Sequence, residues 1–186
     1  MENQWTDIMV DLETTGTAVE STSIIQLSAV MFNLSTGEVG PSFDACLKPV
    51  TSWDKNTLRW WLSTPEKQQI LASITERAEE PHKVINDFYR WNRTVGPATH
   101  FWSKPSHFDY SLLAKYFTLF GYKNPFVYWK ARDMRSYILG LVFPEELPDL
   151  NYNSSNAHNA LADVTFQVRE LIRITKERKN EITEYI

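Results

Sequence analysis

The chain has 186 residues, of which 42% are apolar and 23% charged, and its formal net charge is −4. These values exclude a disordered chain and are typical of one globular domain with a full core. No apolar run reaches the ~20 residues that span a bilayer, and the first residues, MENQWTD, lack the form of a signal peptide. The single cysteine, Cys46, excludes an internal disulfide and a cysteine-based metal cage. We therefore expect residues 1–186 to form a single domain in a reducing cytoplasm.

The first half of the chain predicts three strands and then helices. Strands are predicted at residues 7–13, 23–32 and 42–47, and NLSTGE between the last two predicts a hairpin turn at Gly37. Their short connections favour an antiparallel meander. Three helices are predicted next, the last two with a proline in the first turn, at residues 56–62, 65–75 and 81–93.

The second half of the chain alternates between strands and helices. The predicted elements are a strand at 99–102, a helix at 109–120 that ends at Gly121, a strand at 126–129, a short helix from about 132, and a long helix from Asn159 to about 179. Three antiparallel strands followed by alternating helices and strands predict an α/β fold, with a mixed sheet flanked by helices.

Two acids interrupt the first predicted strand, in the sequence MVDLETTGT. Asp11 and Glu13 are two residues apart, so their side chains point to the same face of the strand. On a buried face their charge is very unfavourable unless it is paired or bound to a cation. The alternative is that this face of the strand is simply solvated.

Two further acids stand where a helix is predicted to begin. Asp109 in SHFDYSLL follows a strand, where it serves equally well as an ordinary helix cap. In HNALAD, His158 and Asp163 are too far apart in angle to share a helical face. If Asn159 is the N-cap, His158 lies in the loop just outside the helix and leans over a site to which Asp163 is fixed.

Together these four acids indicate a cation site. Strand ends and helix starts of an open α/β sheet meet at one edge, and four carboxylates held close together require cations to stay ionised. Oxygen ligands without cysteine favour Mg²⁺ or Mn²⁺, and a pair of such ions suits phosphodiester displacement. Without these four acids the chain has 19 acidic and 19 basic residues, so its net charge neither excludes nor favours nucleic acid.

In this order and spacing, DLETTG, HFD and H-x₄-D resemble the three motifs of the DEDDh 3′–5′ exonuclease superfamily, which has a ribonuclease H-like fold. The motifs span residues 11–163. Two further segments, NTLRWWLS at 56–63 and RDMRS at 132–136, are similar to the group of phage exodeoxyribonuclease A and RNase AS. The second motif differs from that of many relatives in the residues upstream, KPSHFD.

The resemblance implies a role for each matched residue. Asp11, Glu13, Asp109 and Asp163 would hold two Mg²⁺ or Mn²⁺ ions, and Glu13 would also contact a terminal 3′-OH. His158 would take the proton from a metal-bound water, which attacks the terminal phosphodiester and releases a 5′-mononucleotide. The implied partner is the 3′ end of single-stranded DNA or RNA, in the cytoplasm of a bacterium or of a phage-infected cell. Homodimers are common in this group.

Two short segments are candidates for contacting the substrate. Gly16 allows a close backbone approach and Thr14 and Thr15 offer hydroxyl donors, so a 3′-terminal nucleotide can lie against this turn. Trp60 and Trp61 diverge by about 100° on a helix, so we expect one to pack and the other to stack on a base. Alternatively, both are partly exposed packing residues.

Other polar residues are interpreted as structural. Asp133 precedes a helix, where we expect it to act as a cap rather than to support the metal site. Arg169, Arg173 and Lys176 form a basic stripe that points about 120° away from Asp163 on the last helix. A solvated helix face is the simpler interpretation of the stripe, and a patch that guides substrate into a partner subunit is the alternative.

Two other functions compete with that of an exonuclease. The first is a nucleic-acid-binding module of the same fold with weak or no catalysis, although such a module is expected to have lost at least one of the five residues. The second is a ribonuclease H-type endonuclease, which should lack both the Thr-Thr-Gly turn and the histidine before the last aspartate. A phosphoaspartate phosphatase is disfavoured because Glu13 occupies the position where that mechanism needs a second aspartate.

Overall fold

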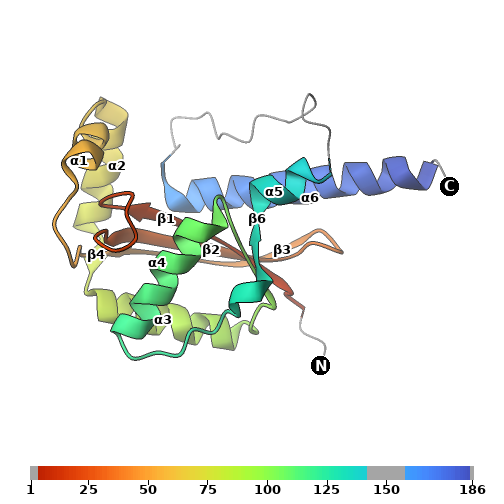
Figure 1. Cartoon of the computed structure of the whole chain (residues 1–186), viewed down its shortest axis with the longest axis horizontal. Helices are drawn as coiled ribbons and strands as arrows, with labels where there is room; N and C mark the ends of the chain where they lie inside the picture. The colour runs from red at the N-terminus through yellow and green to blue at the C-terminus, as the bar shows by residue number, and fades with distance from the viewer. Residues whose placement is uncertain (1–3, 142–157, 185–186) are drawn as a thin grey trace.

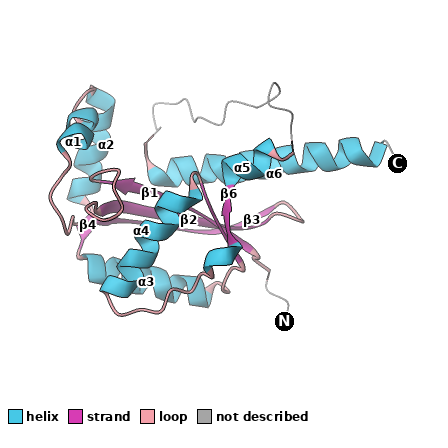
Figure 2. Cartoon of the chain, in the orientation of Figure 1, coloured by secondary structure: helices cyan, strands magenta, loops and turns pink. Residues whose placement is uncertain are grey.

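A mixed six-stranded sheet forms the centre of the protein, with strand order β4-β3-β2-β1-β5-β6 (Figure 1; Figure 2). The computed structural model describes residues 4–141 and 158–184, with side chains described as far as residue 179. Neighbouring strands are antiparallel from β1 to β3, whereas β5 and β6 join β1 in parallel, which confirms the predicted fold class. The strands are β1 (Asp7–Thr14), β2 (Ile24–Asn33), β3 (Glu38–Leu47), β4 (Ala78–Glu79), β5 (His100–Ser103) and β6 (Ala131–Asp133).

The hairpin between β2 and β3 has the predicted turn. Gly37 adopts a positive φ of 77°, which costs glycine little, and its N–H donates to the carbonyl oxygen of Asn33 at 2.7 Å. Strand β3 begins at Glu38, before the predicted residue 42, because its exposed first residues, Glu38 and Val39, still pair with β2.

Helices cover both faces of the sheet. Helices α3 and α4 pack on one face, and α5 and α6 on the other, while α1 and α2 lie beyond one end of the strands. None of the helices within residues 4–141 and 158–184 is long and apolar enough to cross a membrane. The helices are α1 (Lys55–Trp61), α2 (Pro65–Glu76), α3 (Pro81–Thr94), α4 (Ser106–Leu119), α5 (Met134–Leu139), α6 (Ala160–Glu184) and the short 3₁₀ helix η1 (Tyr128–Lys130).

The alternation of side chains along β1 directs its two acids toward α6. Val10 packs with the cluster of α3 and α4, whereas Met9 packs with Val168 in the cluster of α6. Because side chains two apart share a face of a strand, Asp11 and Glu13 lie on the same face as Met9. The apolar half of β1 is thus buried on both faces, and its last residues carry the acids to the start of α6.

Three further elements differ from the prediction. The strand predicted at 126–129 is wrong: Tyr128 and Trp129 belong to η1 and are 71% and 70% exposed, and the strand that pairs with β5 is β6. Aromatic and β-branched residues are typical of strands, but a strand also requires a partner edge, which only the tertiary structure supplies. The two-residue strand β4 was not predicted. Helix α4 begins at Ser106 rather than at Asp109.

Candidate active site

The four acids converge at the end of β1. Asp11 and Glu13 come from the last half of β1, Asp109 from the first turn of α4, and Asp163 from the first turn of α6. Their charges influence one another: Asp11 and Asp163 repel, and Glu13 is repelled by all three other carboxylates. The four carboxylates therefore lie close together, as predicted. Asp109 is not a helix cap, since it is the buried fourth residue of α4.

Each of the four carboxyl groups has a raised pKa. Burial, followed by repulsion from Asp163, raises the pKa of Asp11 to about 7. Burial raises the pKa of Asp163 to about 6, although a bond from the His158 backbone and the charge of Lys104 oppose the rise. Burial is also the first cause of the raised pKa values of Glu13 and Asp109. Such a group of oxygen donors is unfavourable when ionised and fits divalent cations, because Mg²⁺ and Mn²⁺ prefer carboxylate oxygens.

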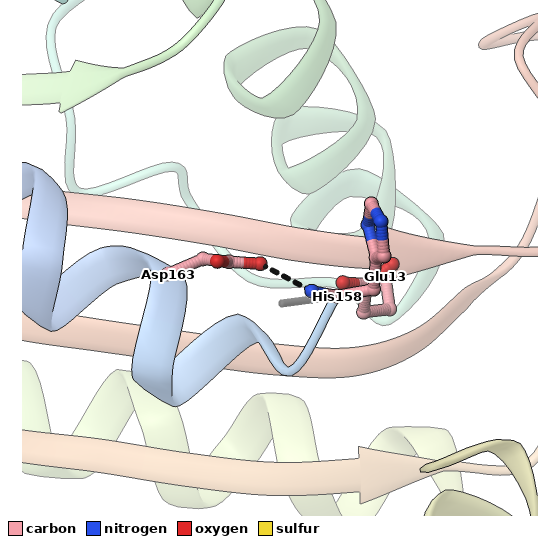
Figure 3. A group of neighbouring side chains, drawn as sticks. All are labelled: Glu13, His158 and Asp163. Atoms are coloured by element: carbon pink, nitrogen blue, oxygen red, sulfur yellow. Dashed lines mark hydrogen bonds between the residues drawn. The ribbon is translucent and has the colours of Figure 1, made fainter. Parts of the chain in front are cut away.

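His158 lies at the entrance to α6, as predicted. Asn159 is the N-cap, since its side-chain oxygen accepts from the Ala162 N–H at 3.3 Å. Figure 3 shows the Asp163 carboxylate reaching back to the backbone nitrogen of His158, which donates to it at 2.9 Å. One ligand atom from each of Glu13, His158 and Asp163 lies within 4.8 Å of the other two.

His158 has an unusual backbone conformation. Its φ is +70°, a region that residues other than glycine seldom occupy and that costs on the order of 1–3 kcal/mol. Its imidazole packs against the ring of Trp60, with centroids 4.6 Å apart and an angle of 86° between the planes. Burial and the nearby charge of Lys67 lower its pKa, which favours the neutral imidazole that a proton acceptor requires.

Several residues of the site were missed by the sequence reasoning. Gln167 donates its side-chain N–H to Asp11 at 3.0 Å and is 4% exposed. It lies one helical turn after Asp163 and thus on the same face, a spacing that could have identified it. The Ser103 side chain, at the end of β5, opposes the rise in the pKa of Asp109, and the charge of Lys104 lowers the pKa values of Asp11 and Asp163. Ser103 and Lys104 carry no recognisable signal in the sequence.

A buried polar side chain ties the start of α6 to the sheet. Gln26 pairs in register with Glu13, donates to Asp44 at 2.7 Å, and accepts from the Ala160 N–H at 3.3 Å. Arg77 in turn donates to Asp44 at 2.8 Å. The first residue of α6, and with it the His158 backbone, is thereby fixed relative to β1.

The Thr-Thr-Gly turn is built differently from the prediction. Thr15 is fully buried, where its hydroxyl accepts from the Ser23 N–H at 2.9 Å and lies 3.3 Å from the Thr22 hydroxyl, so it has no exposed surface for a substrate. Gly16 is buried as well, where an added Cβ would lie 3.1 Å from the Thr22 hydroxyl and 3.3 Å from Asp54. Its missing side chain thus admits neighbouring parts of the chain. The partly exposed Thr14, whose hydroxyl donates to the Gly16 carbonyl at 2.7 Å, is the member of the turn that can still meet a nucleotide.

The paired tryptophans have separate environments. Trp61 is 1% exposed and packs in a cluster with Ile25 and Ile74, so it has no surface for a base. Trp60 is 38% exposed and lies at the active site through its contact with His158. One tryptophan packs and the other is available, as we predicted from their angular separation.

Asp133 is a helix cap, as predicted, and the basic stripe has a described ion-pair network. Asp133 caps α5 by accepting from the Ser136 N–H at 2.8 Å, and it also accepts from the Ser106 N–H of α4 at 2.9 Å. Exposed Arg173 is paired with Glu170 and Glu177, both at 2.8 Å. Arg169 and Lys176 of the basic stripe are exposed as well, so the stripe lies on an exposed face of α6.

The mixed sheet and its flanking helices have the ribonuclease H-like fold of exonuclease I, which several solved structures share. Escherichia coli exonuclease I in complex with a dT13 oligonucleotide has a TM-score of 0.70 at 18% identity, over 98% of this chain and 43% of that chain. A zinc-bound form of the E. coli exonuclease I complex with single-stranded DNA has a TM-score of 0.69 at 19% identity, and the match covers 98% of this chain and 42% of that chain. Exonuclease I of Methylocaldum szegediense has a TM-score of 0.67 at 16% identity, and the match covers 96% of this chain and 42% of that chain. The chain thus spans less than half the length of these proteins.

A family model gives the more specific result. Residues 6–175 match the 3′-5′ exoribonuclease Rv2179c-like domain, and the chain belongs to this family. The match covers β1 through most of α6 and so includes all four acids and His158. A comparison with curated proteins finds no match.

Proposed function

We propose that the protein is a two-metal 3′–5′ exonuclease that removes 5′-mononucleotides from the 3′ end of single-stranded nucleic acid. The observation that carries the proposal is the meeting of four carboxylates with raised pKa values beside a neutral histidine at the end of β1. A structural role does not account for such a cluster, since grouped carboxylates destabilise a fold that does not bind cations. Membership of an exonuclease family supports the same conclusion.

The proposed mechanism assigns a task to each group. Asp11, Glu13, Asp109 and Asp163 would hold two Mg²⁺ or Mn²⁺ ions, which supply a water of lowered pKa and offset the negative charge of the phosphodiester. The His158 imidazole accepts the proton of the attacking water. The bond from phosphorus to the 3′-oxygen of the preceding nucleotide then breaks, which leaves the phosphate on the released 5′-mononucleotide.

Other residues of the site orient these groups. Gln167 holds one oxygen of Asp11, and Asp163 holds the His158 backbone through its second oxygen. The backbone bonds of the Thr-Thr-Gly turn fix the end of β1, from which Glu13 is presented to a terminal 3′-OH. Thr14 and Trp60 remain the candidates for contacting the last nucleotide.

The substrate is proposed to be RNA first and DNA second. The family is described as one of exoribonucleases, and the segments NTLRWWLS and RDMRS favour the group of RNase AS and phage exodeoxyribonuclease A. Two of the overlaid exonuclease I structures contain single-stranded DNA or a deoxyoligonucleotide, which keeps DNA as the second candidate. We further propose that residues 1–186 act as one domain, as a monomer or homodimer, in the cytoplasm.

The test uses matched 5′-labelled RNA and DNA oligonucleotides, single- and double-stranded, with Mg²⁺, with Mn²⁺ or with EDTA. We expect a ladder that shortens from the 3′ end in the presence of metal, with 5′-mononucleotides as the released product. Asp163→Asn is the inactive control. Binding without cleavage of any substrate would instead favour the binding module, and internal cuts in a circular strand would favour the endonuclease.

A further inference from the structure

Trp60 contacts a residue of the site, and stacking on a substrate base, the role predicted from the sequence, does not explain this contact. Its indole meets the His158 imidazole edge to face, at a centroid distance of 4.6 Å. Aromatic rings prefer this geometry, which is directional as well as attractive. The partner of the exposed tryptophan is thus the proposed proton acceptor itself.

The indole is itself held firmly. The Asp54 N–H donates to the Thr15 carbonyl at 2.9 Å, and the Asp54 carboxylate caps α1 through the N–H groups of Asn56 and Thr57. Helix α1, which carries Trp60, is therefore anchored to the same turn that ends β1. The end of β1 thus holds two of the proposed metal ligands directly and, through α1 and Trp60, contacts the proposed base.

A cation defines the orientation of the ring. The Lys67 ammonium lies over the Trp60 indole, 4.0 Å from its centroid, and also donates to the Ser63 hydroxyl at 3.2 Å. That hydroxyl donates to the Trp60 carbonyl at 2.7 Å. Lys67 and Ser63 thus hold both the ring and the backbone of Trp60.

Among the described residues, in contrast, few contacts restrain the side chain of His158. Its backbone adopts a positive φ, and its hydrogen bond to Asp163 is donated by the backbone nitrogen, not by the imidazole. This bond fixes the position of the His158 backbone, but it does not restrict rotation of the side chain. The Trp60 indole is the described contact that restricts this rotation.

We propose that Trp60 is a positioning residue that holds the His158 imidazole in its reactive orientation. This inference rests on the proposed function, in which His158 accepts the proton of the attacking water. Trp60 acts through His158, and the consequence is a loss of turnover when the indole is removed. A contact with a substrate base would instead appear as a loss of binding.

The test is a double-mutant cycle of Trp60→Ala and His158→Ala, with Trp60→Phe as the conservative variant. We expect Trp60→Ala to lower kcat by roughly 10- to 100-fold, since small misplacements of a catalytic group have effects of that size. KM, and the Kd of a 5′-labelled single-stranded oligonucleotide measured with Ca²⁺, should change less than about threefold, which isolates turnover from binding. Trp60→Phe should restore most of the activity, because it keeps an aromatic ring in place.

The cycle gives the decisive comparison. In the His158→Ala background, Trp60→Ala should cause no further loss, because two residues that act as a unit are not additive. Trp129→Ala is the matched control, since Trp129 is exposed and its described ring contact is with Tyr128 rather than with a residue of the site, and it should behave as wild type. Thermal melting of every variant shows whether it is folded, and Trp60→Leu replaces Trp60→Ala if the latter is not.

A readout independent of activity tests the contact itself. In the ¹H–¹³C NMR spectrum, the ring protons of His158 should be displaced by the ring current of Trp60, and Trp60→Ala should abolish the displacement. Loss of this displacement in a protein that cleaves no substrate would refute the proposed function but keep the contact. The inference is overturned if Trp60→Ala lowers kcat equally in both backgrounds, if it raises Kd with kcat unchanged, or if the His158 resonances do not move.

Discussion

Replacing Asp11 with asparagine should stabilise the metal-free protein at neutral and alkaline pH. The substitution keeps the shape of the side chain and an oxygen that can accept from Gln167, but it removes the charge that burial and Asp163 oppose. An acid with a raised pKa binds more protons in the folded than in the unfolded state. Its destabilising effect is therefore absent below pH 3.8, grows as the pH rises, and is complete above about pH 7.

The size of the effect follows from the pKa. A rise from 3.8 to about 7 corresponds to about 4 kcal/mol of free energy of unfolding. Asp11 keeps some exposed surface and shares its repulsion with three neighbours, so we expect about half of this, roughly 2 kcal/mol, from one substitution. For a domain of this length that is a rise in Tm of roughly 4–8 °C.

The assay is thermal melting in EDTA between pH 4 and pH 8.5, with Glu76→Gln as a control that removes an exposed acid outside the site. The difference in Tm between Asp11→Asn and wild type should be absent near pH 4 and reach its full size at pH 8. Mn²⁺ at 100 times its Kd should stabilise wild type by about 2.7 kcal/mol and the variant much less. Equal melting of the two proteins at pH 8 without metal, or a gap that persists at pH 4, would refute the reasoning.

Three further predictions follow from the site. His158→Ala should lower kcat by roughly 10²- to 10⁴-fold with little change in KM, as steady-state kinetics on a single-stranded oligonucleotide would show; near-normal turnover would remove the proposed base. A phosphate or dideoxy block at the 3′ end should stop degradation whereas a 5′ block should not, and a circular strand that is cut would contradict the assignment to an exonuclease. Gln26→Leu should lower the free energy of unfolding by about 1–3 kcal/mol in urea titrations, since it removes a buried partner from both Asp44 and Ala160. An unchanged urea midpoint would show that the start of α6 is held by other contacts.

Alternation and periodicity explain why so much of the fold was predictable. Each strand of the meander has its turn residues in the adjacent sequence, and the helices that follow carry prolines at their first turns. The boundaries that failed depend on other elements instead. Helix α4 starts at Ser106 because Asp133, from the end of a neighbouring strand, accepts its first N–H, and no local residue announces this.

For the site, the sequence by itself was enough to predict which acids lie close together. The spacing of Asp11 and Glu13 on a strand, and the placement of His158 and Asp163 on either side of a helix start, are local properties of the chain. They led to the correct clustering of all four acids before any long-range contact was known.

The roles of the remaining residues were decided only by the tertiary structure. Thr15 looked like a donor to substrate, but the fold buries it completely, with its hydroxyl oxygen accepting from the Ser23 N–H. Gln167 looked like any polar residue of a helix, yet its face meets Asp11, which is 156 residues away in the chain. Trp60 and Trp61 have the same local sequence signal, and the packing of α1 against the end of β1 makes one of them core and brings the other to His158. Hydrogen bonding and burial depend on which groups the fold brings together, so residue type and spacing predicted the cluster of acids but not the groups that hydrogen-bond to it.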